Sequence, residues 1–254
     1  MGIISLTTDF GACDHYVGVM KGIIAGINPS AVVIDITHGI EAYNIAEAAF
    51  KLHASYSYFP EGTIHVAVVD PGVGSARRAI AAEAAGYRFV GPDNGVFSMI
   101  FDKLGVDRMV RITNPEYMLP TVSATFHGRD IFAPAAAHLS KGIALEDLGD
   151  VLTSYESLDI PEAHDGGDVI TGRAIYADRF GNLVTNIPGA VVADSSGIRA
   201  GDLTINSLSL NYADGKEGEL IALVGSSGFL EISVNKGSAF EFFGRLPEVE
   251  VLKA

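Results

Sequence analysis

The sequence has one cysteine, Cys13, among 254 residues, and no long hydrophobic run. A single cysteine cannot form an intrachain disulfide or a cysteine metal cluster, so neither is expected. No stretch reaches the roughly 18 uninterrupted apolar residues of a membrane-spanning helix. The N-terminal stretch Met1–Gly11 lacks a basic region and a small-residue cleavage site, so it is predicted to form the first strand rather than a signal peptide. Together these features predict a cytoplasmic protein.

Basic side chains are also few, because 17 lysines and arginines face 31 aspartates and glutamates and give a formal net charge of −14. Such an acidic chain repels phosphate backbones and anionic lipid surfaces, so neither nucleic acid nor membrane is an expected partner. A cationic small molecule is compatible with this charge. Hydrophobic residues make up 48% of the chain, which is too apolar for disorder and sufficient for one large or two small domains.

The first part of the chain alternates strand-like and helix-like segments. The strand-like runs are Ile3–Thr7, Val32–Thr37, Thr63–Val69, Arg88–Val90 and Met109–Ile112. The helix-like runs, with apolar residues every three or four positions, are Tyr16–Ile27, the segment that follows Asn44, and Arg129–Ser140. This alternation predicts an α/β domain over residues 1–160, with a largely parallel sheet flanked by helices.

The pattern changes after about residue 160. Residues 161–168 are polar and glycine-rich, which is typical of a linker. Residues 169–254 contain short β-rich runs separated by turns and no helical stripe. They predict a small all-β domain that resembles a barrel, with a sandwich as the alternative.

Polar residues follow directly after three of the strand-like runs, at Asp9, His38 and Asp70. In open α/β sheets, ligands bind at the carboxyl ends of the strands, so these three residues are site candidates by position. The alternative is that each aspartate only caps the next turn. Two such aspartates in one sheet favour the functional interpretation.

Asp70 opens a tight turn that contains Gly72 and Gly74. The turn lacks the third glycine of a dinucleotide-binding loop and the Gly-Lys-Ser/Thr of a phosphate-binding loop, so we reject a nucleotide-phosphate site. We interpret it as a rigid turn that orients Asp70 and either Arg77 or Arg78. The alternative is that both arginines are solvated.

His127 lies at the predicted start of a helix, where the positive end of the helix dipole favours a neutral imidazole. A neutral ring there suits hydrogen bonding or proton transfer, and a packed structural histidine is the alternative. The histidines show neither HxxxH nor HExxH spacing, so no metal site is predicted. The other histidines considered as metal ligands, without support, are His38, His53, His65 and His138.

Six motifs occur in order along the chain: Thr7–Gly11, Val68–Gly74, Gly91–Gly95, Thr125–Asp130, Asp178–Asn186 and Gly225–Glu231. As a set they resemble the S-adenosylmethionine (SAM) hydrolases, or SAM hydroxide adenosyltransferases, the sister group of the SAM-dependent fluorinases and chlorinases. The resemblance implies an α/β domain followed by a β-barrel and a homotrimer with active sites between subunits. It also implies that water displaces methionine from the ribose 5′ carbon of SAM to give adenosine, with SAM as substrate and no cofactor.

The resemblance assigns a catalytic set of Asp70, Arg77 and His127, in which Asp70 or His127 takes or shares a proton of the attacking water. Halogenases typically have Tyr at the Asp70 position, and fluorinases have Ser where this chain has Gly128. Fluorinases also carry a long insertion after the motif at Gly91–Gly95, where this chain is short. These departures favour hydroxide over halide as the nucleophile.

The resemblance also implies a set of substrate-binding residues. They are Asp9 for the ribose hydroxyls, Tyr43 beside the sugar, Asp14 and Asp178 for the methionine ammonium, Asn182 for the adenine edge, Ser226 for the methionine carboxylate, and Glu231 and Val234 in the pocket wall. The alternatives are a SAM-dependent halogenase, a nucleoside-binding module without turnover, and a purely structural oligomer.

Overall fold

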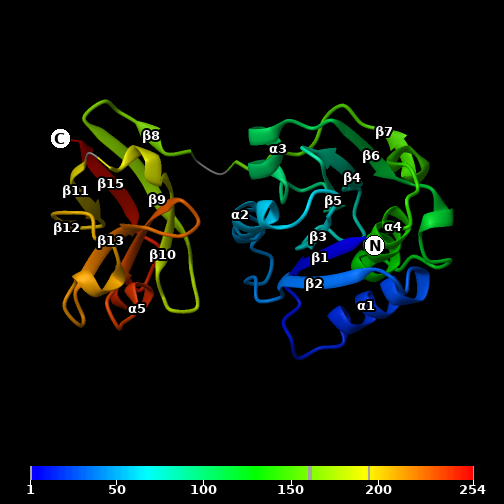
Figure 1. The fold of residues 1–254 in the computed structure, drawn as a ribbon, viewed down its shortest axis with the longest axis horizontal. Helices are drawn as coiled ribbons and strands as arrows, with labels where there is room; N and C mark the ends of the chain where they lie inside the picture. Colours follow the sequence, from blue (N-terminus) through cyan, green and yellow to red (C-terminus); the bar gives the residue numbers. More distant parts are fainter. Residues whose placement is uncertain (1, 160–161, 194, 254) are drawn as a thin grey trace. The chain divides into compact units, whose positions relative to one another are not determined.

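The computed structural model describes residues 2–159, 162–193 and 195–253. It consists of two compact units, Met1–Leu158 and Asp159–Ala254 (Figure 1). Of the expected linker, residue 161 lies outside the described residues, and His164–Asp165 form a short strand, β8, that pairs with the C-terminal sheet. No helix in the described part of the chain has the length and apolar character needed to cross a membrane.

Within the first unit, whose residues 2–158 are all described, seven strands form one sheet in the order β2-β1-β3-β5-β4-β6-β7. They are β1 (Ile3–Thr8), β2 (Val32–Thr37), β3 (Ile64–Val68), β4 (Ala79–Ala84), β5 (Tyr87–Pro92), β6 (Arg108–Ile112) and β7 (Gly149–Val151). Strands β2, β1, β3 and β5 are parallel, whereas β4, β6 and β7 are antiparallel to their neighbours.

The prediction of an α/β domain is confirmed, whereas the prediction of a largely parallel sheet is confirmed only in part, because the sheet is mixed. The reason is the two-residue turn Ala85–Gly86, in which both residues have positive φ, 48° and 83°. Such a turn joins β4 and β5 into a hairpin, and the strands of a hairpin are antiparallel. No strand was expected where β4 lies, so the hairpin was not predicted.

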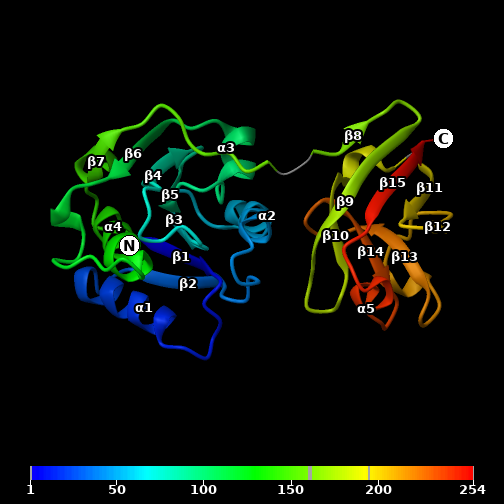
Figure 2. The ribbon, with the colours of Figure 1, turned by 180° about the vertical axis from the view of Figure 1, so that it is seen from behind.

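Helices cover both faces of the sheet (Figures 1 and 2). They are α1 (Tyr16–Ile27), α2 (Ile45–Ser55), α3 (Ser98–Leu104) and α4 (Ala133–Ser140). Helices α1 and α4 pack on one face, where Met20 and Phe132 are fully buried, and α2 and α3 pack on the other around Phe89 and Phe101. A π-helical turn, Gly128–Phe132, leads into α4, and such turns are frequent at functional sites.

The strands of the second unit form an antiparallel sheet. Those in the described residues are β8 (His164–Asp165), β9 (Val169–Ala177), β10 (Leu183–Pro188), β11 (Ser195–Ala200), β12 (Leu203–Ile205), β13 (Leu220–Val224), β14 (Phe229–Val234) and β15 (Glu248–Lys253). The order is β12-β11-β15-β9-β10-β14-β13, and a bridge between Leu208 and Ala222 links the segment after β12 to β13. The sheet therefore nearly closes into a barrel, with a short helix, α5 (Ala239–Phe243), beside it.

His65 is a buried titratable group in the first unit, on the central strand β3. Its Nδ1 lies 2.7 Å from Ser5 Oγ, and its ring stacks on Phe89 with centroids 5.4 Å apart. Burial among apolar and aromatic side chains disfavours the charged ring and lowers the pKa of His65 to about 4. The folded protein therefore holds this ring neutral at neutral pH.

We predict that this burial makes the fold acid-sensitive. The unfolded chain binds a proton at His65 near the ordinary histidine pKa of 6.5, whereas the folded chain binds it near 4. The free energy of unfolding therefore has its full value with respect to His65 above pH 6.5. It falls as the pH drops from 6.5 toward 4, by up to about 1.4 kcal/mol per pH unit. Urea unfolding at several pH values measures this slope. A His65→Asn variant keeps an acceptor for Ser5 and should lose this part of the slope; an unchanged slope would contradict the assignment.

Candidate active site

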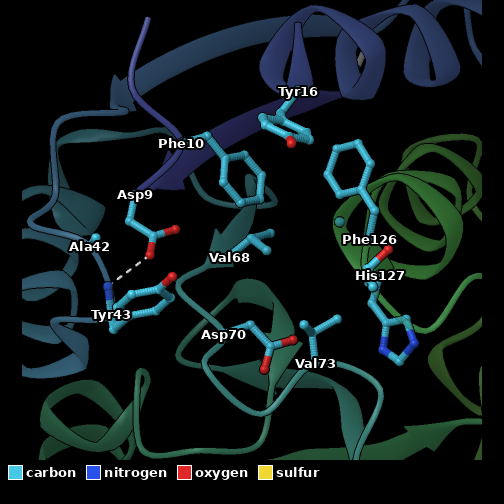
Figure 3. Close-up of a pocket in the computed structure, with 12 residues that line it drawn as sticks. Asp9, Phe10, Tyr16, Ala42, Tyr43, Val68, Asp70, Val73, Phe126 and His127 are labelled. Carbon is cyan, nitrogen blue, oxygen red and sulfur yellow. Dashed lines mark hydrogen bonds between the residues drawn. The ribbon is translucent and has the colours of Figure 1, made fainter. Parts of the chain in front are cut away.

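Two carboxylates follow adjacent strands of the mixed sheet and line one pocket (Figure 3). Asp9 follows β1 and Asp70 comes two residues after β3, so both lie at the carboxyl ends of parallel strands. The pocket has a volume of about 350 Å³. Its lining residues are Asp9, Phe10, Tyr16, Ala42, Tyr43, Val68, Asp70, Val73, Thr125, Phe126, His127 and Gly128.

Arg77 joins Asp70 to His127. Its Nε donates to Asp70 Oδ1 and Oδ2 at 2.9 and 3.0 Å, and its Nη2 donates to Asp70 Oδ2 at 2.5 Å. The same Nη2 lies 2.6 Å from His127 Nδ1. The guanidinium packs over the ring of Phe132, with Cζ 5.3 Å from the ring centroid. Arg77 thus lies behind two pocket-lining groups and fixes both.

The turn after β3 brings Asp70 to this position. The Val73 amide donates to the Asp70 carbonyl at 3.2 Å, which closes the turn. Gly74 has φ of 75°, and a Cβ there would lie 2.2 Å from the Ala124 carbonyl oxygen. The turn therefore packs backbone to backbone against the segment that carries His127, and only glycine fits at that contact.

His127 is held as a neutral ring. Burial is the main cause that lowers its pKa, and the Arg77 charge lowers it further, while Asp70 has the opposite, weaker effect. Arg77 can only donate hydrogen bonds, so His127 Nδ1 accepts and the ring proton is assigned to Nε2. The pocket wall therefore contains a carboxylate and a neutral imidazole that are both held by Arg77.

The neighbouring arginine has a separate partner. Arg78 forms an ion pair with Asp93, and its Nε donates to Asp93 Oδ2 at 2.5 Å. Asp93 Oδ1 accepts from the Glu156 amide at 2.8 Å. Of the two arginines left open by the sequence, the structure brings Arg77 to Asp70 and assigns Arg78 a structural contact.

The structure also brings Tyr43 beside Asp9, while Asp14 lies apart from the pocket. The Tyr43 amide donates to Asp9 Oδ2 at 2.9 Å (Figure 3). Tyr43 has a left-handed backbone, φ 68°, and its side chain is 71% exposed. Asp14 is exposed and is not among the pocket-lining residues. Asp14 lies in an exposed bend before α1, so the structure does not bring this predicted residue to the pocket lining.

The expected site residues of the second unit line a cavity of about 740 Å³ within that unit. They are Asp178, Asn182, Ser226, Glu231 and Val234. The turn between β9 and β10 orients the Asp178 carboxylate, which accepts from the amides of Phe180 and Asn182 at 2.8 and 2.9 Å. Asn182 Nδ2 also donates to Asp178 Oδ2, at 3.0 Å. The motif of this turn therefore builds a fixed acidic group.

Tyr212 and Phe180 line the same cavity and were not predicted. The Tyr212 hydroxyl donates to Glu231 Oε1 at 2.6 Å, and burial and Glu231 raise the Tyr212 pKa. Phe180 is 78% exposed. Tyr212 begins a single 3-10 turn, Tyr212–Asp214, outside any β-rich run, so periodicity carried no signal for it. Phe180 lies inside the motif Asp178–Asn186, but the sequence does not show that its side chain is exposed at the cavity.

Residues 2–159, 162–193 and 195–253 contain no arrangement of side chains suited to bind a metal ion. No group of three or more His, Cys, Asp or Glu side chains there is placed to hold an ion. The histidines considered as ligands make other contacts: His65 with Ser5, and His38 with Thr8.

Comparisons with known proteins agree with the resemblance found in the sequence, which is confirmed. The family models of the SAM hydroxide adenosyltransferase N-terminal and C-terminal domains match residues 4–149 and 172–251. A Thermus thermophilus protein named (R)-S-adenosyl-L-methionine hydrolase is 37% identical over 93% of each chain. A fluorinase of an Actinoplanes species is 26% identical over 92% of this chain and 91% of its own. The crystal structure of an uncharacterized conserved protein from Thermotoga maritima has a TM-score of 0.92 and 39% identity, covering 98% of this chain and all of that one.

We predict that Arg77 controls the protonation of His127. In Arg77→Met, the cation that disfavours the imidazolium is gone and Asp70 is unpaired, so the pKa of His127 rises. Titration of the imidazole signals by NMR measures the change, with His127→Gln used to assign the resonance. Arg78→Met is the matched control and should leave the His127 titration in place. An unchanged or lower pKa in Arg77→Met would refute the assigned geometry.

Proposed function

The chain belongs to the SAM hydroxide adenosyltransferase family, and from that premise we propose that it uses water to displace L-methionine from the 5′ carbon of S-adenosyl-L-methionine, giving adenosine. The observation that carries the proposal is the cluster of Asp70, Arg77 and His127 at the wall of a pocket that also holds Asp9. The greater identity to a relative named hydrolase than to one named fluorinase supports the same reaction.

The reaction needs help at the nucleophile and little at the leaving group. A lone pair of the water oxygen forms the bond to the 5′ carbon as the carbon–sulfur bond breaks. The electron pair of the carbon–sulfur bond goes to sulfur, so methionine leaves as a neutral thioether. Water must lose one proton in this step. Asp70 accepts that proton, since a carboxylate oxygen has lone pairs beyond those that Arg77 occupies. The His127 Nε2–H donates to the water oxygen and orients it.

Halide is a poor fit for this pocket. The Asp70 carboxylate repels an anion at the nucleophile position. A Cβ at Gly128 would lie 3.1 Å from Phe126 Cε2, 3.2 Å from Met20 Sδ and 3.4 Å from Val68 Cγ1, so a serine hydroxyl there requires its neighbours to shift. These contacts argue against the halogenase alternative.

We assign substrate contacts to both units. In the first pocket, Asp9 binds the ribose hydroxyls beside Tyr43, since a carboxylate can accept from two vicinal hydroxyls. The remaining roles follow the family pattern: Asp178, with Asp14, for the methionine ammonium, Asn182 for the adenine edge, Ser226 for the methionine carboxylate, and Glu231 and Val234 for the cavity wall.

We further propose a homotrimer in which the first-unit pocket of one subunit faces the second-unit cavity of its neighbour. Each of the two is an open half-site with an exposed aromatic side chain, Tyr43 in one and Phe180 in the other. Large exposed aromatic side chains at a concave site favour burial by a partner or ligand. The number of subunits, three, is taken from the family pattern.

Purified protein incubated with SAM should yield adenosine and L-methionine, identified by chromatography, at a rate that EDTA leaves unchanged.

Asp70→Asn should lower turnover roughly 10²–10⁴-fold with a smaller change in SAM affinity, because it removes the proton acceptor. Asp9→Ala should chiefly weaken binding, because it removes the ribose acceptor. Calorimetric SAM affinity beside single-turnover rates separates the two effects.

Three results would count against the assigned reaction and roles. A 5′-halogenated nucleoside as the main product in chloride buffer would support a halogenase. Binding of SAM without products would support a nucleoside-binding module. Near-normal turnover with lost affinity in Asp70→Asn would make Asp70 a substrate ligand rather than the proton acceptor.

The shared site predicts complementation between inactive variants. Asp70→Asn disables the first half-site and Asp178→Asn the second, so a random mixture of the two forms some sites with both halves intact. Mixed subunits should recover roughly a quarter of the wild-type activity, while each variant alone stays low. Light scattering should report a trimer. An active monomer, or no recovery after verified subunit exchange, would place both halves in one chain.

A further inference from the structure

His38 makes two contacts with the turn that carries Asp9. Its Nδ1 lies 2.9 Å from Thr8 Oγ1, and its carbonyl oxygen accepts from the Gly11 amide at 2.8 Å. Thr8 Oγ1 also accepts from the Phe10 amide at 3.3 Å. The residues on both sides of Asp9 are therefore held by one histidine at the end of β2.

The other side of the His38 ring faces an ion pair. His38 Nε2 lies 3.1 Å from Asp35 Oδ1, at ion-pair distance though not in hydrogen-bond geometry, and Lys21 Nζ lies 2.6 Å from Asp35 Oδ2. A bare ring nitrogen so close to a carboxylate oxygen is unfavourable, so we assign the proton to Nε2. With the proton on Nε2, Nδ1 is the acceptor, and the buried Thr8 hydroxyl donates to it.

We propose that His38 is a positioning residue for the nucleoside end of the site, acting through Thr8 on the Asp9 turn, with Asp35 and Lys21 fixing its ring. The proposal rests on the proposed function, which makes Asp9 the ribose ligand. His38 does not line the pocket, so it acts without touching the substrate.

The contacts form a closed set between two loops. Thr8 and Gly11 contact His38, and Asp9 Oδ2 accepts from the Tyr43 amide five residues further along the second loop. If the Thr8–His38 contact is lost, the Asp9 turn samples further conformations. Apparent affinity then falls in proportion to the fraction of molecules with the competent turn, while the Asp70 cluster remains intact.

Matched substitutions separate the two faces of the ring. Thr8→Val removes the hydroxyl and keeps the side-chain shape, and His38→Gln keeps a donor near the Nε2 position but loses the acceptor for Thr8. Thr8→Ser keeps the hydroxyl, and His38→Asn keeps an acceptor at the Nδ1 position. These last two variants are the conservative controls.

Thr8→Val and His38→Gln should each raise KM for SAM and Kd for adenosine roughly tenfold, the effect of one buried hydrogen bond, with kcat within about threefold. The double variant should cost no more than either single one, because both remove the same contact. Thr8→Ser and His38→Asn should restore most of the affinity. Unchanged KM in both disruptive variants, or equal losses in the controls, would overturn the proposal.

Amide hydrogen exchange in the ligand-free protein tests the contact without relying on activity. The amides of Gly11 and Tyr43 should exchange faster in Thr8→Val and His38→Gln than in the wild type or the controls. If the wild type does not hydrolyse SAM but exchange changes as expected, the proposed function fails and the positioning role stands. Unchanged exchange at both amides refutes the positioning role, whatever the activity. If Thr8→Val does not fold, His38→Gln against His38→Asn gives the same comparison.

Discussion

The Arg77 guanidinium is the interaction on which the rest of the site depends, because it donates to Asp70 and His127 at once. Two groups from distant parts of the chain converge on one side chain, so the turn after β3 and the segment before the π-helical turn must touch. The contact of Gly74 with the Ala124 carbonyl meets that requirement. The arginine side chain is only 10% exposed, and stacking on Phe132 supports the plane that makes both hydrogen bonds.

The same cation decides what each partner can do. Breaking a buried ion pair leaves an uncompensated charge, so replacing either Asp70 or Arg77 alone lowers the free energy of unfolding. Arg77 also disfavours a second positive charge on His127, which burial disfavours already. The result is a neutral imidazole whose Nδ1 accepts from Arg77, a tautomer that His127 would not adopt if its Nδ1 faced a carboxylate.

The sequence predicted the parts of the site that depend on position along strands and failed where long-range contacts decide. Asp9 and Asp70 were placed from the ends of apolar runs, and the parallel strands bring those ends to one edge. The largely parallel sheet was only partly confirmed, because one hairpin turn, Ala85–Gly86, reverses β4 and makes the sheet mixed. Tyr212, in a short 3-10 turn, was missed because its partner Glu231 is 19 residues away, in β14. No local pattern reports such a contact.

Charge migration explains why the carboxylate belongs at the water side of the proposed reaction. The sulfonium carries a full positive charge in the ground state and loses it as the carbon–sulfur bond breaks, while the attacking water becomes positive until its proton leaves. A carboxylate beside sulfur therefore stabilises the substrate more than the transition state and slows the chemical step. A carboxylate beside the water stabilises the transition state more, because the positive charge moves toward it. Asp70, with its oxygens fixed by Arg77 before substrate arrives, meets that requirement, and the acidic groups of the second unit serve binding best when they contact the ammonium rather than the sulfur.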